Sequence, residues 1–226
     1  MASYIWKSCK ATLACGQRQG GGMSTSRHAK VSRRTKETNV RATLRLNGKG
    51  KVSVKTGIAF LDHMLTLVGT HGGFDLTVKA TGDVDVDLHH TNEDVGLVLG
   101  QAFDWALGDR RGINRYGASY VPMEEALARV VLDFSGRPRL VIRTARGVTM
   151  ESPRGSRGAY QWGDAEHFLE SFTRTSKTTI HIDVFAGGDF HHTVEAVFKA
   201  LGRALGQATS TDPRLKGRIP SSKGKL

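Results

Sequence analysis

The first regular part of the chain shows alternation of apolar and polar residues. Residues 40–46 alternate in this way, which is typical of a strand with one buried face. Asn47-Gly48 favours a hairpin turn directly after it. Residues 51–55 are therefore expected to return as the neighbouring strand.

Helical spacing follows. Residues 58–70 carry apolar side chains at steps of three and four, which predicts a helix with one buried face. Residues 74–81 alternate again as a third strand. A second helix then runs to Leu107, and Gly108 ends it.

The later part of the chain repeats this order. Residues 125–133 alternate as residues 37–45 do, and Gly136 occupies the turn position of Gly48. Residues 140–144 form the next expected strand. The sequence therefore contains an internal duplication.

A stretch rich in Gly, Ser and Arg, residues 147–163, interrupts the second copy as a loop insertion. A helix opens after it at Glu166-His167, and residues 179–185 alternate as a strand. Each half is thus predicted as strand, strand, helix, strand, helix, an α/β fold of the α+β type. One sheet face of each half would be covered by helices. Stacking the halves, through sheets or through helices, would bury what neither buries alone.

These patterns divide the chain into four parts: a leader (1–32), a first half (33–114), a second half (115–212) and a basic tail (213–226). The leader is rich in Gly, Ser and Lys and lacks acidic residues, so it is predicted to be disordered. It is compatible with a targeting peptide or with no role at all. Both cysteines lie in it and form no disulfide framework, which favours a reducing compartment. We expect a cytoplasmic protein, with organelle targeting through the leader as the alternative.

The net charge of +12 raises the question of nucleic-acid binding. Much of the excess lies at the two ends, and no basic run is interleaved with aromatic residues. No apolar run approaches the roughly 20 residues that span a bilayer. We therefore expect neither nucleic acid nor membrane as a partner. The basic ends are either solvated or bind an anionic substrate.

One motif occurs twice: His-His-Thr-Asn-Glu at residues 89–93 and His-His-Thr-Val-Glu at residues 191–195. A helical pattern follows each copy, with Gly100 and Gly202 at matching positions. If each His pair ends an extended segment, its two imidazoles point to opposite faces, so that one pair serves two ions. The Thr would then cap the helix, and the Glu would lie in its first turn. Two similar metal sites built from both halves are expected. The alternative is that these residues only decorate a strand-to-helix turn.

Six of the nine histidines fall at positions matched by the repeat, and two glutamates complete the set. The candidate ligands are His63, His89, His90, Glu93, His167, His191, His192 and Glu195. Imidazole and carboxylate without thiolate suit Mn²⁺, and also Fe²⁺ and Zn²⁺. His71 shares a helix face with His63 but has no twin, because Thr175 stands at the equivalent place. It is a candidate acid/base group.

A further set of residues has the chemistry of an anion site. It comprises Arg115, Arg137, Lys199 and the tail segment Pro220-Ser221-Ser222-Lys223-Gly224. Lys199 follows Glu195 by four positions and so lies on the same helix face. Backbone, hydroxyl and ammonium donors together suit a phosphate, although each alone is compatible with solvated surface.

Taken together, the motifs resemble the imidazoleglycerol-phosphate dehydratase family. The resemblance runs from about Arg33 to the C-terminus, and only the leader and the extended loop at 150–161 depart from it. It is carried by Phe60-Leu61-Asp62-His63-Met64-Leu65, His71-Gly72, His89-His90-Thr91-Asn92-Glu93-Asp94, Glu166-His167-Phe168, His191-His192-Thr193-Val194-Glu195-Ala196 and the tail segment 220–224.

The resemblance implies two Mn²⁺ ions per active site. One would be held by His63, His90, Glu93 and His191, and the other by His89, His167, His192 and Glu195. Substrate would contact Glu37, His63, His71, Arg115, Arg137, Lys199, Ser221, Ser222 and Lys223. It also implies trimers that assemble into a 24-subunit shell, with sites at subunit interfaces.

The implied fold is a pair of halves similar to domain 2 of ribosomal protein S5, each with a roughly four-stranded mixed sheet and two helices on one face. Since the pattern gives three clear strands per half, the fourth is expected in the short segment before each His pair.

The implied activity belongs to histidine biosynthesis: a lyase that dehydrates D-erythro-imidazole-glycerol 3-phosphate to imidazole acetol phosphate. The proton to be lost sits on a carbon that bears only hydroxyl and alkyl groups, so it is not acidic. A metal-bound imidazolate form of the ring can instead expel the neighbouring hydroxyl, which acidifies the C–H. Glu37 and His71 are the candidates for the proton transfers. The alternative function is a dinuclear metal-dependent phosphate-ester hydrolase.

Overall fold

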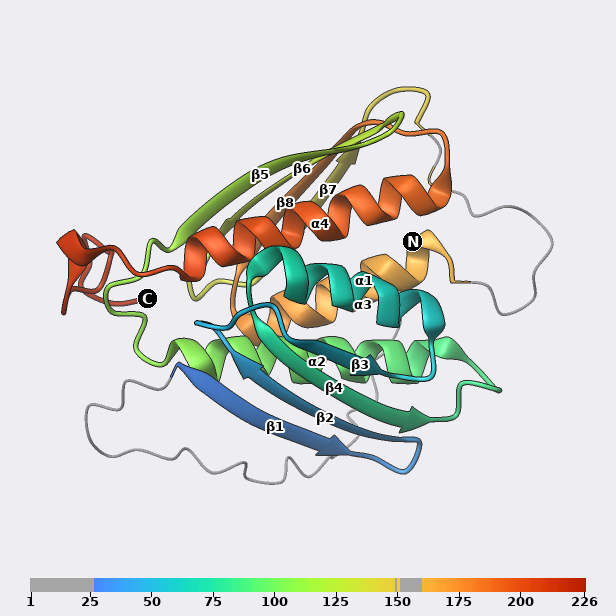
Figure 1. Ribbon diagram of the computed structural model, residues 1–226, viewed down its shortest axis with the longest axis horizontal. Helices are drawn as coiled ribbons and strands as arrows, with labels where there is room; N and C mark the ends of the chain where they lie inside the picture. Colours follow the sequence, from blue (N-terminus) through green and yellow to red (C-terminus); the bar gives the residue numbers. More distant parts are fainter. Residues whose placement is uncertain (1–26, 149, 151–159) are drawn as a thin grey trace, which may run out of the picture.

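The computed structural model describes residues 27–148, 150 and 160–226. The predicted leader up to residue 26 and most of the loop insertion lie outside the described residues. Two four-stranded mixed sheets enclose a layer of helices, so the predicted duplication is confirmed (Figure 1). Among the described helices, none combines the length and the apolar character that a bilayer-spanning segment needs.

Both halves have the same order of elements. The first contains β1 (His28–Arg34), β2 (Thr38–Arg45), β3 (Val52–Lys55), α1 (Ala59–Gly72), β4 (Asp75–Gly82) and α2 (Leu88–Leu107). The second contains β5 (Tyr116–Met123), β6 (Ala126–Asp133), β7 (Arg139–Thr144), α3 (Trp162–Ser176), β8 (Thr179–Ala186) and α4 (Phe190–Thr209), followed by the short 3₁₀ helix η1 (Pro213–Leu215).

The sheet orders, β1-β2-β4-β3 and β5-β6-β8-β7, correct two expectations. β3 runs parallel to β4 and β7 parallel to β8, so neither returns beside the preceding strand as a hairpin. At Asn47-Gly48 the glycine instead permits a close approach to the start of β4, because a Cβ there would collide with the backbone of Asp75. The Asp75 carboxylate holds the same loop by accepting bonds from Lys49 N and Lys51 N.

The fourth strand of each half is also not where it was expected. β1 and β5 open their halves and pair antiparallel with β2 and β6, whereas the segments before the His pairs are not strands. β1 includes residues 28–32, which were assigned to a disordered leader. Its alternation is short and flanked by basic residues, with Ala29 and Val31 as its buried pair.

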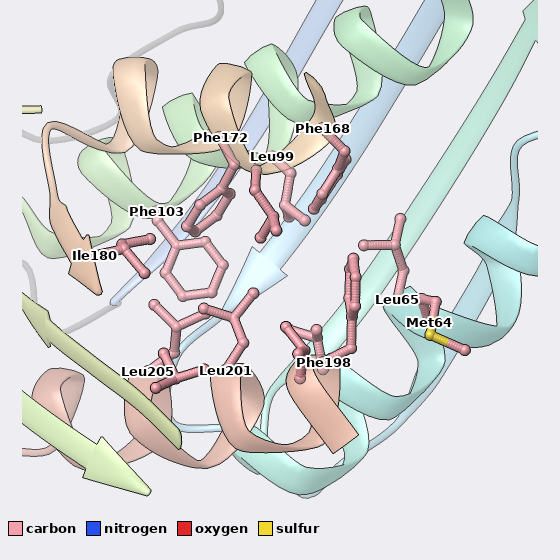
Figure 2. Close-up of a cluster of buried hydrophobic side chains, with 14 of the residues drawn as sticks. Met64, Leu65, Leu99, Phe103, Phe168, Phe172, Ile180, Phe198, Leu201 and Leu205 are labelled. Carbon is pink, nitrogen blue, oxygen red and sulfur yellow. The ribbon is translucent and has the colours of Figure 1, made fainter. Parts of the chain in front are cut away.

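The four long helices lie between the two sheets, where α2 packs against α3 and α1 against α4 (Figure 1). The halves therefore stack through helices rather than sheets. Figure 2 shows side chains from all four helices meeting in the core, among them Leu65, Phe103, Phe168 and Phe198. This layer carries every histidine of the proposed ligand set, so its packing positions them.

Candidate metal centre

Both His pairs lie inside the first turn of a helix, not at the end of an extended segment. Asp87 caps α2 and its side chain accepts from His89 N, while Asp189 caps α4 and accepts from His192 N, each at 3.0 Å. The expectation that Thr91 or Thr193 caps the helix is therefore wrong. Both threonines are buried within the helices, because an aspartate stands earlier in the chain and is an equally good cap.

The helical start changes how the motif works. In a helix, residues four apart lie on one face, whereas neighbours are turned by about 100°. The first His and the Glu of each motif therefore point the same way. The second His of each motif points elsewhere.

The first cluster, here called triad A, joins α1 and α4. It consists of His63, His191 and Glu195, whose ligand atoms all lie within 4.8 Å of one another. Glu195 Oε2 is 3.0 Å from His191 Nε2 and 3.5 Å from His63 Nε2. The rings of His191 and Phe60 are nearly perpendicular, with 5.3 Å between ring centroids. Triad A thus presents two imidazole nitrogens and one carboxylate oxygen to a common point.

Glu195 is also the partner of Lys199 on the next turn of α4, with 2.7 Å between Lys199 Nζ and Glu195 Oε1. Burial alone would raise the pKa of the Glu195 carboxyl. The hydrogen bond and charge of Lys199, with a smaller contribution from His63, outweigh burial and lower that pKa. Glu195 is therefore anionic at neutral pH. Lys199, expected at the phosphate, is held beside triad A.

The second cluster, triad B, is the duplicate of the first and joins α2 and α3. His89 Nδ1 lies 3.1 Å from His167 Nδ1, and His89 Nε2 lies 3.8 Å from Glu93 Oε2. Its nitrogens do not all face one point, because the two sides of the His89 ring face different partners. Arg174 Nη2 contacts Glu93 Oε1 at 2.9 Å, which parallels the lysine on Glu195.

The second His of each motif lies against an acid instead of a triad. His90 Nδ1 is 3.1 Å from Asp83 Oδ2, and this contact, reinforced by the charge of Glu37, raises the pKa of His90. His192 Nδ1 is 3.1 Å from Glu125 Oε2, which raises the pKa of His192. The pKa of Glu125 is lowered to about 2, first by the bond from Asp189 N and then by other contacts that include His192.

The two predicted quartets are therefore not assembled within one protomer. Glu195, not Glu93, lies with His63 and His191, so the carboxylates belong to the opposite sets from those implied by the resemblance. The reason is the helical spacing of His and Glu, which keeps each Glu beside the first His of its own motif. His90 and His192 join neither triad.

The two acid/base candidates lie at different places. His71 lies in the last turn of α1, and burial together with the charges of Lys199 and Arg203 lowers the pKa of its imidazole. Glu37 is exposed in the turn between β1 and β2, on the side of His90. Its carboxylate has no hydrogen-bond partner among the described residues.

Apart from Lys199, which lies beside triad A, the anion-binding set gathers at the far end of the second half. Arg115 N bonds to Ala208 O near the end of α4, and the Arg115 guanidinium bridges Asp133 and Pro220 O. Arg137 is exposed, and the neighbouring Gly136 lies against Leu226 of the tail. The 20 residues of α4 separate this end from the His pair by roughly 30 Å. The tail that carries Ser221, Ser222 and Lys223 thus lies beyond the end of α4 that is remote from the His pair (Figure 1).

Three residues that contact the proposed ligands were not predicted: Asp83 contacts His90, Glu125 contacts His192 and Arg174 contacts Glu93. A signal existed for Glu125, which occupies the repeat position of Glu37. Asp83 and Arg174 have no counterpart in the other half that could have marked them.

The donor set of both triads fits a divalent transition ion. Imidazole nitrogen and carboxylate oxygen are ligands that Mn²⁺ accepts, and three protein ligands per triad leave coordination positions open for substrate. No thiolate competes in the described part of the chain, because both cysteines precede it.

Comparison with known proteins agrees with the duplicated, histidine-bearing architecture. A family model described as imidazoleglycerol-phosphate dehydratase matches residues 56–205. Imidazoleglycerol-phosphate dehydratase 1, chloroplastic, of Arabidopsis thaliana is 48% identical over 217 residues, which cover 96% of this chain and 78% of the relative. The enzyme of Herminiimonas arsenicoxydans is 48% identical over 204 residues, 90% of this chain and all of the relative.

Solved structures show the same likeness. The crystal structure of the dehydratase from Pyrococcus furiosus in complex with (S)-C348 superimposes with a TM-score of 0.72 and 34% identity, covering 87% of this chain and 100% of that one. The duplicated sheets, the doubled His motif and the sequence identity over most of the chain lead to one conclusion: the protein belongs to the imidazoleglycerol-phosphate dehydratase family.

Proposed function

We propose that this enzyme dehydrates imidazole glycerol phosphate with two Mn²⁺ ions, one held at triad A and one at triad B. The observation that carries the proposal is triad A, whose three ligand atoms lie together, with its duplicate at the matching helix positions in triad B. When bound, Mn²⁺ would act as a Lewis acid on the imidazole ring of the substrate.

The missing ligands are proposed to come from a second copy of the chain. Each triad offers three ligands, and His90 and His192, which contact Asp83 and Glu125, belong to neither triad of their own protomer. The distribution of the anion set supports the same view. In the substrate only three carbons separate the imidazole ring from the phosphate group. A molecule of that size cannot reach from the His pair to the anion set of the same protomer, because the roughly 30 Å length of α4 lies between them. A shell of 24 subunits built from trimers, with active sites at subunit interfaces, would bring the two ends together.

The residues proposed for proton transfer are His71 and Glu37. The lowered pKa of His71 keeps its imidazole neutral at pH 7, so that it can accept a proton. The exposed Glu37 carboxylate is free to do so as well. Dehydration removes a hydroxyl from one carbon and a hydrogen from its neighbour, and the resulting enol becomes the ketone. Arg115, Arg137, Lys199, Ser221, Ser222 and Lys223 are proposed to bind and orient the substrate.

One assay tests the proposal directly. The Mn²⁺-loaded protein is incubated with imidazole glycerol phosphate, and the enolisable ketone and free phosphate are measured together. We expect ketone without phosphate release, loss of activity with a chelator and recovery when Mn²⁺ is returned. Phosphate release without ketone would favour the dinuclear hydrolase instead, and sedimentation with and without Mn²⁺ tests the assembly.

The location of the enzyme is tested through the leader. The Arabidopsis thaliana and Pisum sativum relatives are named as chloroplastic, whereas other relatives are bacterial. We propose a cytoplasmic enzyme, and organelle targeting is the alternative. Residues 1–32 fused to a fluorescent protein decide between the two, since diffuse fluorescence is expected only for a leader without a targeting role.

A further inference from the structure

The second histidines of the two motifs share one feature that the triads lack. In each, Nδ1 lies 3.1 Å from a carboxylate oxygen: His90 against Asp83, and His192 against Glu125. We propose that Asp83 and Glu125 are positioning residues that hold these two imidazoles through Nδ1 and so reserve Nε2 as the metal donor. This inference rests on the proposed function, because it concerns how the same metal sites are completed.

The chemistry of imidazole supports this role. An ionised carboxylate can only accept a hydrogen bond, so the facing Nδ1 must carry the proton. In a neutral ring the lone pair then lies on Nε2, which is the form that binds a metal ion. Metal-bound histidines usually donate their other N–H to a carboxylate or carbonyl, which fixes the tautomer and the ring orientation.

The two halves reach this arrangement from different parts of the fold. Gly82 and Gly187 are equivalent, because each leaves room for the Thr of the following motif. After Gly82, a five-residue loop that begins with Asp83 precedes α2, whereas only Gly188 and Asp189 separate Gly187 from α4. The second half thus has no acid at the position of Asp83.

In the second half the acid comes from the turn between β5 and β6. The short loop before α4 brings that turn close, since Glu125 Oε1 accepts from Asp189 N at 2.8 Å while Oε2 faces His192. Duplication alone would place equivalent acids on equivalent histidines. Here Asp83 and Glu125 come from positions that the repeat does not match, yet each places a carboxylate at Nδ1. This points to a need of both imidazoles for a carboxylate at that nitrogen.

This difference between the halves also explains why Glu37 is left unpaired among the described residues. Glu37 is the first-half equivalent of Glu125. With Asp83 orienting His90, the Glu37 carboxylate has no hydrogen-bond partner among the described residues and is available for substrate chemistry. In the second half Glu125 is engaged by His192. One repeat position therefore serves orientation in one half and is left open for proton transfer in the other.

A purely structural role explains Asp83 poorly. Its Oδ2 contacts His90, whereas Oδ1 is buried without a hydrogen-bond partner among the described residues. The cap residue Asp87 of the same loop bonds a backbone N–H, which the Asp83 carboxylate does not. Among the described residues, the hydrogen bond that the Asp83 carboxylate makes is the one to His90.

The test compares the affinity for Mn²⁺, read from the electron paramagnetic resonance signal of the free ion, across full-length variants. Asp83→Ala and Glu125→Ala are expected to bind Mn²⁺ about 10- to 100-fold more weakly than the wild type. Asp83→Asn and Glu125→Gln should lose less, because an amide oxygen still accepts from Nδ1–H and Gln still accepts from Asp189 N.

A neighbouring acid serves as the matched control. Asp85→Asn removes the same charge from the same loop as Asp83, and Asp85 bonds to neither His90 nor His192 in the described structure. Glu124 is no such control, because its carboxylate lies within 4.8 Å of the ligand atoms of Glu125 and His192. Asp85→Asn should stay within about 2-fold of the wild type, and all variants are compared by thermal unfolding. Equal losses in the control and the test variants, or no loss in the alanine variants, would overturn the inference. A wild-type protein that dehydrates its substrate without binding Mn²⁺ would instead overturn the proposed metal sites.

Discussion

Gly96→Ala is expected to destabilise the protein although alanine favours helices. A Cβ added at Gly96 of α2 would lie 2.7 Å from Phe168 O and 2.9 Å from Ser171 Cβ of α3. Ordinary contact begins at 3.4 Å, so the two helices must separate by about 0.7 Å, the difference between 3.4 and 2.7 Å. Overpacking of this kind costs roughly 1–3 kcal/mol, and helix propensity returns about 1 kcal/mol.

The net loss of up to about 2 kcal/mol corresponds to a melting temperature lower by several degrees, at roughly 2–4 °C per kcal/mol for a chain of this size. Scanning calorimetry at fixed protein concentration measures it. Gly163→Ala is the control, because a Cβ at Gly163 in the first turn of α3 meets no described residue within 4 Å, so the substitution should stabilise the protein slightly. An increase in melting temperature for Gly96→Ala equal to that of the control would refute the packing argument.

Three further predictions concern charge, metal and substrate. Asp183 is bonded by Arg129 and Arg143, which lower its pKa against the opposing effect of burial, so Asp183→Asn should cost about 1–2 kcal/mol in urea unfolding at pH 7. Since a lowered carboxyl pKa stabilises the fold above the unfolded pKa of about 3.9, this difference should shrink as pH falls below 4, and a constant difference would contradict it. His89→Ala should reduce bound Mn²⁺ from two ions to one per chain, as measured by elemental analysis. An unchanged count of two ions would show that triad B holds none of them. Lys223→Ala should raise KM for imidazole glycerol phosphate more than it lowers kcat, and an unchanged KM would remove the tail from the phosphate site.

The parts of the fold that could be predicted are those with a local signal. The helical period at residues 58–70 and the glycine stop at Gly108 located α1 and the end of α2 closely. The repeated order of strands and helices revealed the duplication. Strand neighbours were not predictable, because alternation shows that a strand has a buried face but not which strand lies beside it.

The candidate site also has a part that the sequence could predict and a part that it could not. The doubled motif identified the ligand types, and comparison between the halves identified His63 and His167. Within one protomer the carboxylates are grouped differently from the predicted partition, because that grouping depends on whether the His pairs are extended or helical. Asp87 and Asp189 decide that, since a cap two positions before the first His of the pair places both imidazoles inside the helix. Asp83 reaches His90 through a loop contact that no sequence period encodes.

Stability and metal geometry depend on the same helix contacts. Each triad takes its single His from one helix and its His, Glu pair from the helix packed against it. Close approach of these helices relies on glycines: Gly96 and Gly100 let α2 lie on α3, and Gly202 and Gly206 let α4 lie on α1. A change that separates α2 from α3 therefore moves His167 away from His89, while it leaves both sheets intact. Gly96→Ala should thus weaken Mn²⁺ binding at triad B more than its modest cost in stability suggests, and triad A should keep its affinity because α1 and α4 are undisturbed.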